Sequence, residues 1–88
     1  MKLKYSFEIM ELDDEIVAVP VGRNANELHS ILNLNEVGKR IIEILHEEIT
    51  EEDLVSRLLS EYVGAKDDVE KAVHLFVEQL RQEKLLDT

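Results

Sequence analysis

The stretch NEVGKRIIEILHEE, residues 35–48, marks the point where the sequence changes from the period of a strand to the period of a helix. Its apolar residues recur at offsets of four, three and one, which is the spacing of a single stripe along a helix: Val37, Ile41, Ile44 and Leu45. Glu48 ends the stripe, and Asn35 is a residue type that caps helices. We therefore predict a first helix that begins at Asn35.

The residues before this stretch follow a period of two. From Leu3 to Ile9, apolar and polar side chains alternate, which is the pattern of a half-buried strand. Asp13 and Asp14 interrupt the pattern, and the β-branched segment 15–19 suits a second strand that pairs back on the first as a hairpin. Pro20 and Gly22 are predicted to end this strand, because proline donates no ladder hydrogen bond.

A third short strand is predicted at Leu28-His29-Ser30-Ile31-Leu32, after a polar loop over residues 23–27. Side chains at consecutive strand positions point to opposite faces, so one of Ile31 and Leu32 packs inside while the other faces outward. The sequence leaves open which of the two does so.

Two further helices follow the first. Thr50, with Asp53 three residues later, predicts the start of one helix, whose buried face is Leu54, Val55, Leu58, Leu59 and Tyr62. Gly64 is predicted to end it, and Asp67 with Glu70 repeats the capping pattern for a longer helix. The apolar stripe of that helix is Val69, Ala72, Val73, Phe76, Val77 and Leu80. Leu85 and Leu86 are expected to finish the chain against the core.

Strands followed by helices predict an α+β fold with three antiparallel strands and then three helices. A chain of 88 residues with 44% hydrophobic residues suits one compact domain over residues 1–88. The chain contains no cysteine, so packing must supply its stability without disulfides or thiolate metal sites.

The charge balance is strongly acidic, with a formal net charge of −10. Such a surface repels phosphate backbones and anionic lipid, so neither nucleic acid nor a membrane is expected as a partner. The charge either keeps a small protein soluble or steers a basic partner toward it. Without a continuous apolar run of about 18 residues, and without the apolar core of a signal peptide near Met1, we expect a soluble, cytoplasmic protein.

No constellation of catalytic or ligand-binding residues is visible. His29, His46 and His74 lack the spacing of a zinc site, and the three glycines form no phosphate-binding loop. The acids at residues 13–15 lack the alternating ligands of a calcium loop and suit a turn. Since no nucleophile stands at a readable spacing from a base either, we expect a binding domain with no catalytic residues, bound metal or cofactor.

Several segments, in their order along the chain, resemble the PqqD family, named for coenzyme PQQ synthesis protein D. A leucine-asparagine pair enters the first helix, with glycine three residues after the asparagine and a branched apolar residue three beyond that: Leu34, Asn35, Gly38 and Ile41. The resemblance continues through residues 50–55 and 58–62, and then through Asp68-Val69, Phe76-Val77 and Leu80. One departure is Lys84, which precedes the final Leu85-Leu86 where the family often has glycine.

The resemblance implies a winged-helix-like fold that is not catalytic. Such domains bind the leader segment of a ribosomally made precursor peptide and present it to a modifying enzyme, often a radical SAM enzyme that carries its own iron–sulfur clusters. In the family the peptide lies along the third strand, in a groove walled by the third helix. Carried over to this chain, the implied peptide-binding residues are Leu28, His29, Ser30, Ile31, Leu32, Asp68, Val69, Ala72, Val73 and Phe76.

The residues themselves agree with such a role. An edge strand has unpaired N–H and C=O groups that an extended peptide can satisfy. On the third helix, Val69 and Val73 are expected to be the more open members of the stripe, and Leu75 lies off the stripe as a possible partner contact. The acids Glu27, Asp68 and Glu70 would favour a basic peptide.

Three other interpretations stay open. The same fold could serve as an adaptor for a folded enzyme, with no precursor peptide involved. A winged-helix regulator that binds DNA is disfavoured because the third helix carries more acids than bases. A small enzyme of a new type would need catalytic residues, and the sequence shows no candidates for them. The sequence does not determine the oligomeric state.

Overall fold

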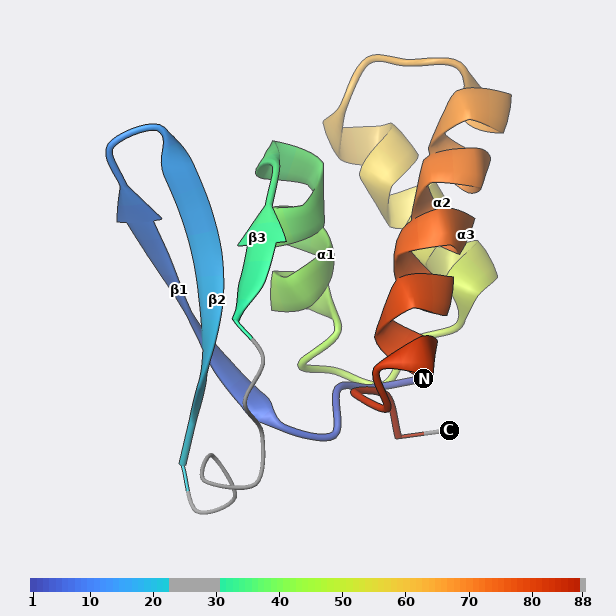
Figure 1. Cartoon of the computed structure of the whole chain (residues 1–88). Helices are drawn as coiled ribbons and strands as arrows, with labels where there is room; N and C mark the ends of the chain where they lie inside the picture. The colour runs from blue at the N-terminus through green and yellow to red at the C-terminus, as the bar shows by residue number, and fades with distance from the viewer. Residues whose placement is uncertain (23–30, 88) are drawn as a thin grey trace.

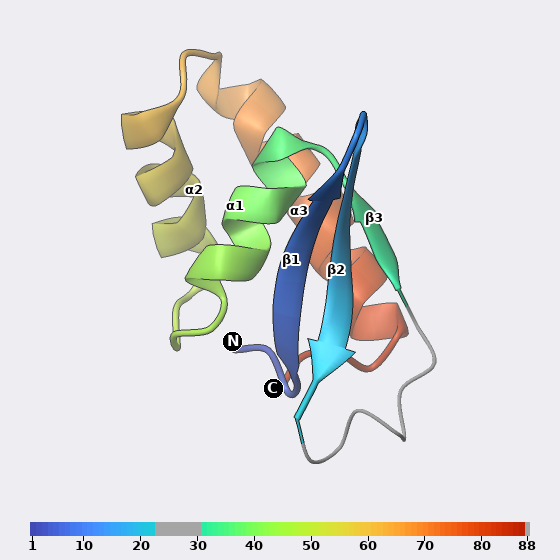
Figure 2. The ribbon, with the colours of Figure 1, turned by 90° about the vertical axis from the view of Figure 1, so that its left-hand side faces the viewer.

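The computed structural model describes residues 1–22 and 31–87. The sheet is built from β1 (Ser6–Leu12), β2 (Glu15–Val21) and β3 (Leu32–Leu34), and the helices are α1 (Glu36–Ile44), α2 (Glu51–Glu61) and α3 (Lys66–Gln82). The predicted α+β order of three strands followed by three helices is confirmed. All three helices lie to one side of the sheet (Figures 1 and 2). The single-domain organisation over residues 1–88 stays a prediction.

The three strands form an antiparallel sheet in the order β1-β2-β3. The predicted hairpin is confirmed: Leu12 pairs with Glu15 across a turn at Asp13 and Asp14. Asp13 takes a positive φ of 51°, a conformation that aspartate adopts more readily than most residues. Among the described residues, β3 pairs only with β2 and therefore forms one edge of the sheet.

The first two strands differ in extent from the prediction. Leu3 belongs to no named strand; it forms an isolated bridge with Leu86, and its N–H donates to the carbonyl of Leu45. The prediction that Pro20 ends β2 is wrong, because Pro20 lies within the strand opposite Phe7. The described pairs of β2 with β3 end at Ala18, two residues before Pro20. A proline is tolerated within a strand where its nitrogen has no ladder partner.

The third strand also differs from the prediction. Within the described residues it begins at Leu32 and runs to Leu34, whereas Ile31 lies just before it and outside the ladder. Leu28, His29 and Ser30 lie outside the described residues. The pairs of β3 with β2 are Leu32 with Ala18, Asn33 with Val17, and Leu34 with Ile16.

The helix starts follow the sequence in two cases out of three. The Gly38 N–H donates to Asn35 Oδ1 at 2.7 Å, and the Asp53 N–H donates to Thr50 Oγ1 at 3.1 Å, so both predicted caps are confirmed. The predicted Asp67 cap of α3 is wrong: this helix starts after Ala65, and Asp67 lies in its first turn. In the first turn its carboxylate can still interact favourably with the positive end of the helix dipole.

The core lies between the inner face of the sheet and the helices. Phe7, Ala18 and Leu32 are its buried strand residues. The helices and the chain ends add Leu3, Ile41, Ile42, Ile44, Leu45, Leu54, Val55, Leu58, Val73, Val77, Leu80, Leu85 and Leu86. The predicted burial of Leu85 and Leu86 is confirmed, but Ala72 and Tyr62, predicted for buried stripes, are exposed.

Candidate functional site

The free edge of β3 and the helix α3 lie at the same side of the molecule, with α1 behind and between them (Figures 1 and 2). Only Asn35 separates the last residue of β3 from the first residue of α1. The path of the chain therefore fixes the edge strand directly against the start of α1.

Gly38 lies where β3, α1 and α3 come together. A Cβ atom added to it would lie 3.4 Å from both Leu34 Cδ2 and Phe76 Cε1, and 3.3 Å from Asn35 Oδ1. Those distances are tighter than ordinary van der Waals contact, so only glycine lets the Leu34 side chain and the Phe76 ring approach α1 this closely. Apolar side chains of the edge strand and of α3 thus both lie against α1 at Gly38.

One side of α3 continues this apolar contact. Val69, Ala72 and Phe76 are spaced by three and four residues, which places them on the same side of the helix. Val69 and Phe76 are half-buried, and Ala72 is exposed between them. We call the set Leu34, Val69, Ala72 and Phe76 the β3–α3 strip.

The side of α3 that faces α2 has a different character. A surface hollow of about 640 Å³ lies there, lined by residues of α2 and α3 that include Glu51, Glu70 and His74. His74 Nδ1 lies 3.3 Å from Glu51 Oε2, and Lys66 Nζ lies 3.7 Å from Glu70 Oε1. Glu70 was expected near the groove beside the third strand and the third helix. It lies toward α2 instead, because it stands six positions before Phe76 and the helix turns it to another side.

The predicted site residues fall into three groups. Leu28, His29 and Ser30 lie outside the described residues. Leu32 and Val73 are buried in the core, with exposed fractions of 6% and 0%, so the expectation that Val73 is partly open is wrong. A partner can reach the rest: Ile31 is 61% exposed, Asp68 and Ala72 are exposed, and Val69 and Phe76 are half-buried.

The structure answers the question that the sequence left open for Ile31 and Leu32. Leu32 points into the core and Ile31 points outward. Leu75, predicted to lie off the stripe, has an exposed fraction of 62%.

The prediction omitted Leu34 and Gly38 from the site. Gly38 carried a readable signal, because a glycine inside a helix is disfavoured by about 1 kcal/mol relative to alanine and so indicates a close approach. Leu34 had no such signal, since a leucine before a capping asparagine is also typical of ordinary core packing.

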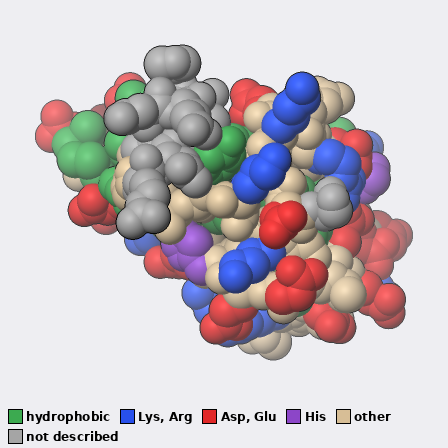
Figure 3. All heavy atoms as spheres, turned by 90° about the horizontal axis from the view of Figure 1, so that it is seen from below, with side chains coloured by type: hydrophobic (Ala, Val, Ile, Leu, Met, Phe, Trp, Pro, Cys, Tyr) green, Lys and Arg blue, Asp and Glu red, His purple; other side chains and the backbone are tan. Residues whose placement is uncertain are grey.

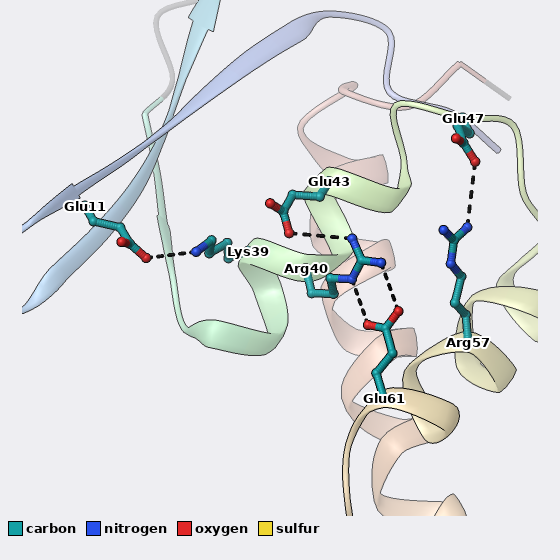
Figure 4. A network of polar contacts seen from close by, with 7 residues as sticks. All are labelled: Glu11, Lys39, Arg40, Glu43, Glu47, Arg57 and Glu61. Atoms are coloured by element: carbon teal, nitrogen blue, oxygen red, sulfur yellow. Dashed lines mark hydrogen bonds and ion pairs between the residues drawn. The ribbon is translucent and has the colours of Figure 1, made fainter.

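Ion pairs cover the opposite, outer side of α1 (Figure 4). Arg40 donates to both carboxylate oxygens of Glu61 on α2, at 2.7 and 2.9 Å, and Lys39 donates to Glu11 on β1 at 2.9 Å. The hydrogen bond from Arg40 lowers the pKa of Glu61, and the bond to Glu11 raises the pKa of Lys39. These cations are thus engaged within the protein, away from the β3–α3 strip.

The molecule seen from below carries acidic side chains along much of its outline, with lysine and arginine between them (Figure 3).

Over residues 1–22 and 31–87, no group of three or more His, Cys, Asp or Glu side chains is placed to hold a metal ion. Within the same ranges, no helix has the length and apolar character that crossing a membrane requires.

Comparisons with known proteins point to one family. A solved structure described as TbiB1 in complex with the TbiA(beta) leader peptide is similar to this chain with a TM-score of 0.72 and 26% identity, over 99% of this chain and 95% of that one. A second, a lasso peptide synthetase B1 complexed with the leader peptide, has a TM-score of 0.64 and 21% identity over 96% and 93% of the two chains, and supports the fold alone. No curated protein shows significant similarity.

The family model described as coenzyme PQQ synthesis protein D (PqqD) matches residues 15–86, which include every described element from β2 to α3. The resemblance noted in the helix-entry motif of Leu34, Asn35 and Gly38 is therefore confirmed over most of the sequence. The chain belongs to the PqqD family.

Proposed function

We propose that this chain captures the leader segment of a ribosomally made precursor peptide and presents it to a separate modifying enzyme. The observation that carries the proposal is the position of β3, an edge strand beside the apolar β3–α3 strip. The likeness to TbiB1, whose structure contains a leader peptide, supports the same role.

Strand addition to β3 supplies the backbone part of the binding. An extended peptide can pair with the free N–H and C=O groups of this strand, and each such hydrogen bond contributes about 0.5–1.5 kcal/mol net. Because β3 has only three residues, backbone pairing alone gives modest affinity. Apolar contacts with Leu34, Val69, Ala72 and Phe76 are needed to add affinity and selectivity.

The chain itself acts as a non-catalytic adaptor in this proposal, with no bound cofactor. A radical SAM enzyme, which brings its own iron–sulfur clusters, is our candidate for the modifying partner, on the basis of the family resemblance. The chemistry then belongs to that enzyme, and this domain raises the local concentration of the precursor next to it.

The charge near the strip gives a weaker preference for a basic peptide than the sequence suggested. Glu70 faces α2, and Glu27 lies outside the described residues. Asp68 is exposed at the start of α3, four residues before Ala72. A single exposed carboxylate acts mainly on the association rate and loses its effect at high salt.

The test is a titration of isotope-labelled protein with peptides, followed by amide chemical shifts. The first probes are the TbiA(beta) leader peptide and the leader segments of precursor peptides encoded near this gene. We expect shifts concentrated in residues 31–38 and along the Val69, Ala72 and Phe76 side of α3. Shifts concentrated around His74 and Glu51 instead would contradict strand capture at β3.

Two variants with the same change in charge refine the test. Ala72→Arg places a long side chain on the strip and is expected to weaken peptide binding by tenfold or more, about 1.4 kcal/mol. Ser60→Arg adds the same charge on the exposed surface of α2 and is expected to leave binding unchanged. Equal effects of the two variants would argue for a general charge effect and against the strip.

If no leader peptide binds but a folded modifying enzyme does, the adaptor interpretation without a peptide replaces ours.

A further inference from the structure

Asn33 stands at the end of a row of side chains on the outer face of the sheet. The register pairs Met10 with Val17 and Val17 with Asn33, so these three residues form one row across β1, β2 and β3. Because side chains alternate along a strand, the row lies on the face opposite to Leu32 and Leu34. Asn33 is exposed, and Val17 beside it is only 7% exposed.

A peptide strand added to β3 extends every row of the sheet by one side chain. Two rows on the inner face, through Leu32 and through Leu34, would receive peptide side chains that point toward the core side and the β3–α3 strip. The row through Asn33 would receive the side chain between them, on the outer face. This alternation holds whether the peptide runs parallel or antiparallel to β3.

We propose that Asn33 is a specificity-determining residue that selects the outward-facing side chain of the bound peptide. The inference rests on the proposed function, because it requires a strand on β3, and it goes further by naming the chemistry of one peptide position. Directly opposed side chains on neighbouring strands have Cβ atoms about 4.5–5.5 Å apart, which is within reach of an amide hydrogen bond.

The amide of Asn33 both donates and accepts hydrogen bonds. Its other neighbour in the row, Val17, offers no polar group. The best-matched peptide side chain at this position is therefore polar and uncharged, such as asparagine, glutamine, serine or threonine. The peptide residues before and after this position point to the inner face, where apolar side chains suit the β3–α3 strip. The preferred substrate therefore carries an apolar–polar–apolar triplet in the segment that pairs with β3.

Changing the charge at residue 33 provides the test, since Asn33 is exposed and its substitution leaves the core intact. A display library of random peptides of about 10–12 residues, long enough at about 3.3 Å per residue to pass β3 on both flanks, is selected against the wild type, Asn33→Asp and Asn33→Lys. The matched controls are Ser60→Asp and Ser60→Lys on α2. The position of selected peptides on β3 is assigned from amide shifts.

We expect Asn33→Asp to enrich lysine and arginine at the outward position, and Asn33→Lys to enrich aspartate and glutamate there, with the inner positions unchanged. Single peptides that differ only at that position should change in Kd by about 1.5- to 5-fold between the two variants, as cross-strand charge pairs do. The Ser60 variants should select the same peptides as the wild type.

Two negative results have different meanings. If selected peptides bind along β3 but their outward residue is the same for wild type, Asn33→Asp and Asn33→Lys, the role of Asn33 is refuted and strand capture stands. If peptides bind only at sites away from β3, strand capture itself is refuted. A change that the Ser60 controls reproduce would assign the selection to net charge and would also overturn the inference.

Discussion

The two sides of α1 are held in different ways. On its inner side, the absence of a Cβ at Gly38 leaves room for Leu34 and Phe76 to pack closely, so packing fixes the helix against β3 and α3. On its outer side, Lys39 and Arg40 form ion pairs to β1 and α2. Packing therefore sets the shape of the β3–α3 strip, because packing depends steeply on distance, whereas exposed ion pairs contribute little and tolerate movement.

Truncating Phe76 tests the packed side and has the largest expected effect. Phe76→Ala removes a half-buried ring next to Gly38 and should lower the free energy of unfolding by about 2–3 kcal/mol, somewhat less than for a fully buried phenylalanine. Leu75→Ala, one residue earlier on the same helix but 62% exposed, should change it by less than about 0.5 kcal/mol. Urea unfolding of both variants measures the two free energies of unfolding. Equal losses would show that packing at Phe76 contributes no more than an exposed leucine does.

A pair of glycine substitutions comes next. Gly38→Ala should destabilise by about 1 kcal/mol despite the higher helix propensity of alanine, because the new Cβ lies 3.3–3.4 Å from three neighbouring atoms. Gly64→Ala meets nothing nearer than the Val69 Cγ2 at 3.7 Å and should be neutral or stabilising by up to about 1 kcal/mol. Thermal unfolding decides the sign for each, and a stabilising Gly38→Ala would mean that the inner contact is loose.

The acid dependence of stability reports on the outer side. Arg40 lowers the pKa of Glu61 from its ordinary value of 4.5, so this pair stabilises the folded state fully above that pH and stops doing so as the pH falls through the lowered pKa. Glu61→Gln should therefore unfold at a lower temperature than wild type near pH 7, with the difference shrinking toward pH 3. Glu52→Gln, which lies outside the described ion pairs, is the control and should show no such convergence.

The smallest expected effect belongs to Lys39. Its pKa is raised by the bond to Glu11, so its contribution is present below the ordinary value of 10.5 and is lost as the pH rises through the raised pKa. Lys39→Gln should lower the unfolding temperature slightly in dilute buffer and not at all in concentrated salt, since salt screens exposed charges. A loss as large as that of Phe76→Ala would show that the ion pairs, and not packing, position α1.

The sequence predicts the kinds of elements better than their ends. The period of three to four identifies all three helices, and the period of two together with β-branched residues identifies the first two strands. The third strand was predicted over residues 28–32, which share only Leu32 with the described β3. The side-chain caps at Asn35 and Thr50 are readable because Asn and Thr are preferred N-cap residues. The start of α3 was misjudged because acids favour both the cap and the first helical turn. The extent of β2 through Pro20 depends on its pairing with Phe7 of β1, which no local pattern contains.

The candidate site is less predictable than the fold. Periodicity placed Val69 and Phe76 on α3, but Ala72 and Val73 belong to the same apolar run and only the packing of α3 against its neighbours decides that Val73 is buried and Ala72 exposed. Likewise, the acids at the start of α3 form one cluster in sequence, yet the helix turns Glu70 toward α2. The role of Asn33 depends on strand register, which emerges only once β2 and β3 are paired.

Because a single residue, Asn35, joins β3 to α1, the proposed capture of a peptide at the strand edge would be coupled to fraying of the helix. A ligand that holds β3 in place would also hold the Asn35 carboxamide over the Gly38 N–H. The first helical turn would then open less often while the ligand is bound. Hydrogen exchange at the Gly38 amide would then slow as the bound fraction rises, giving a local measure of capture within the helix.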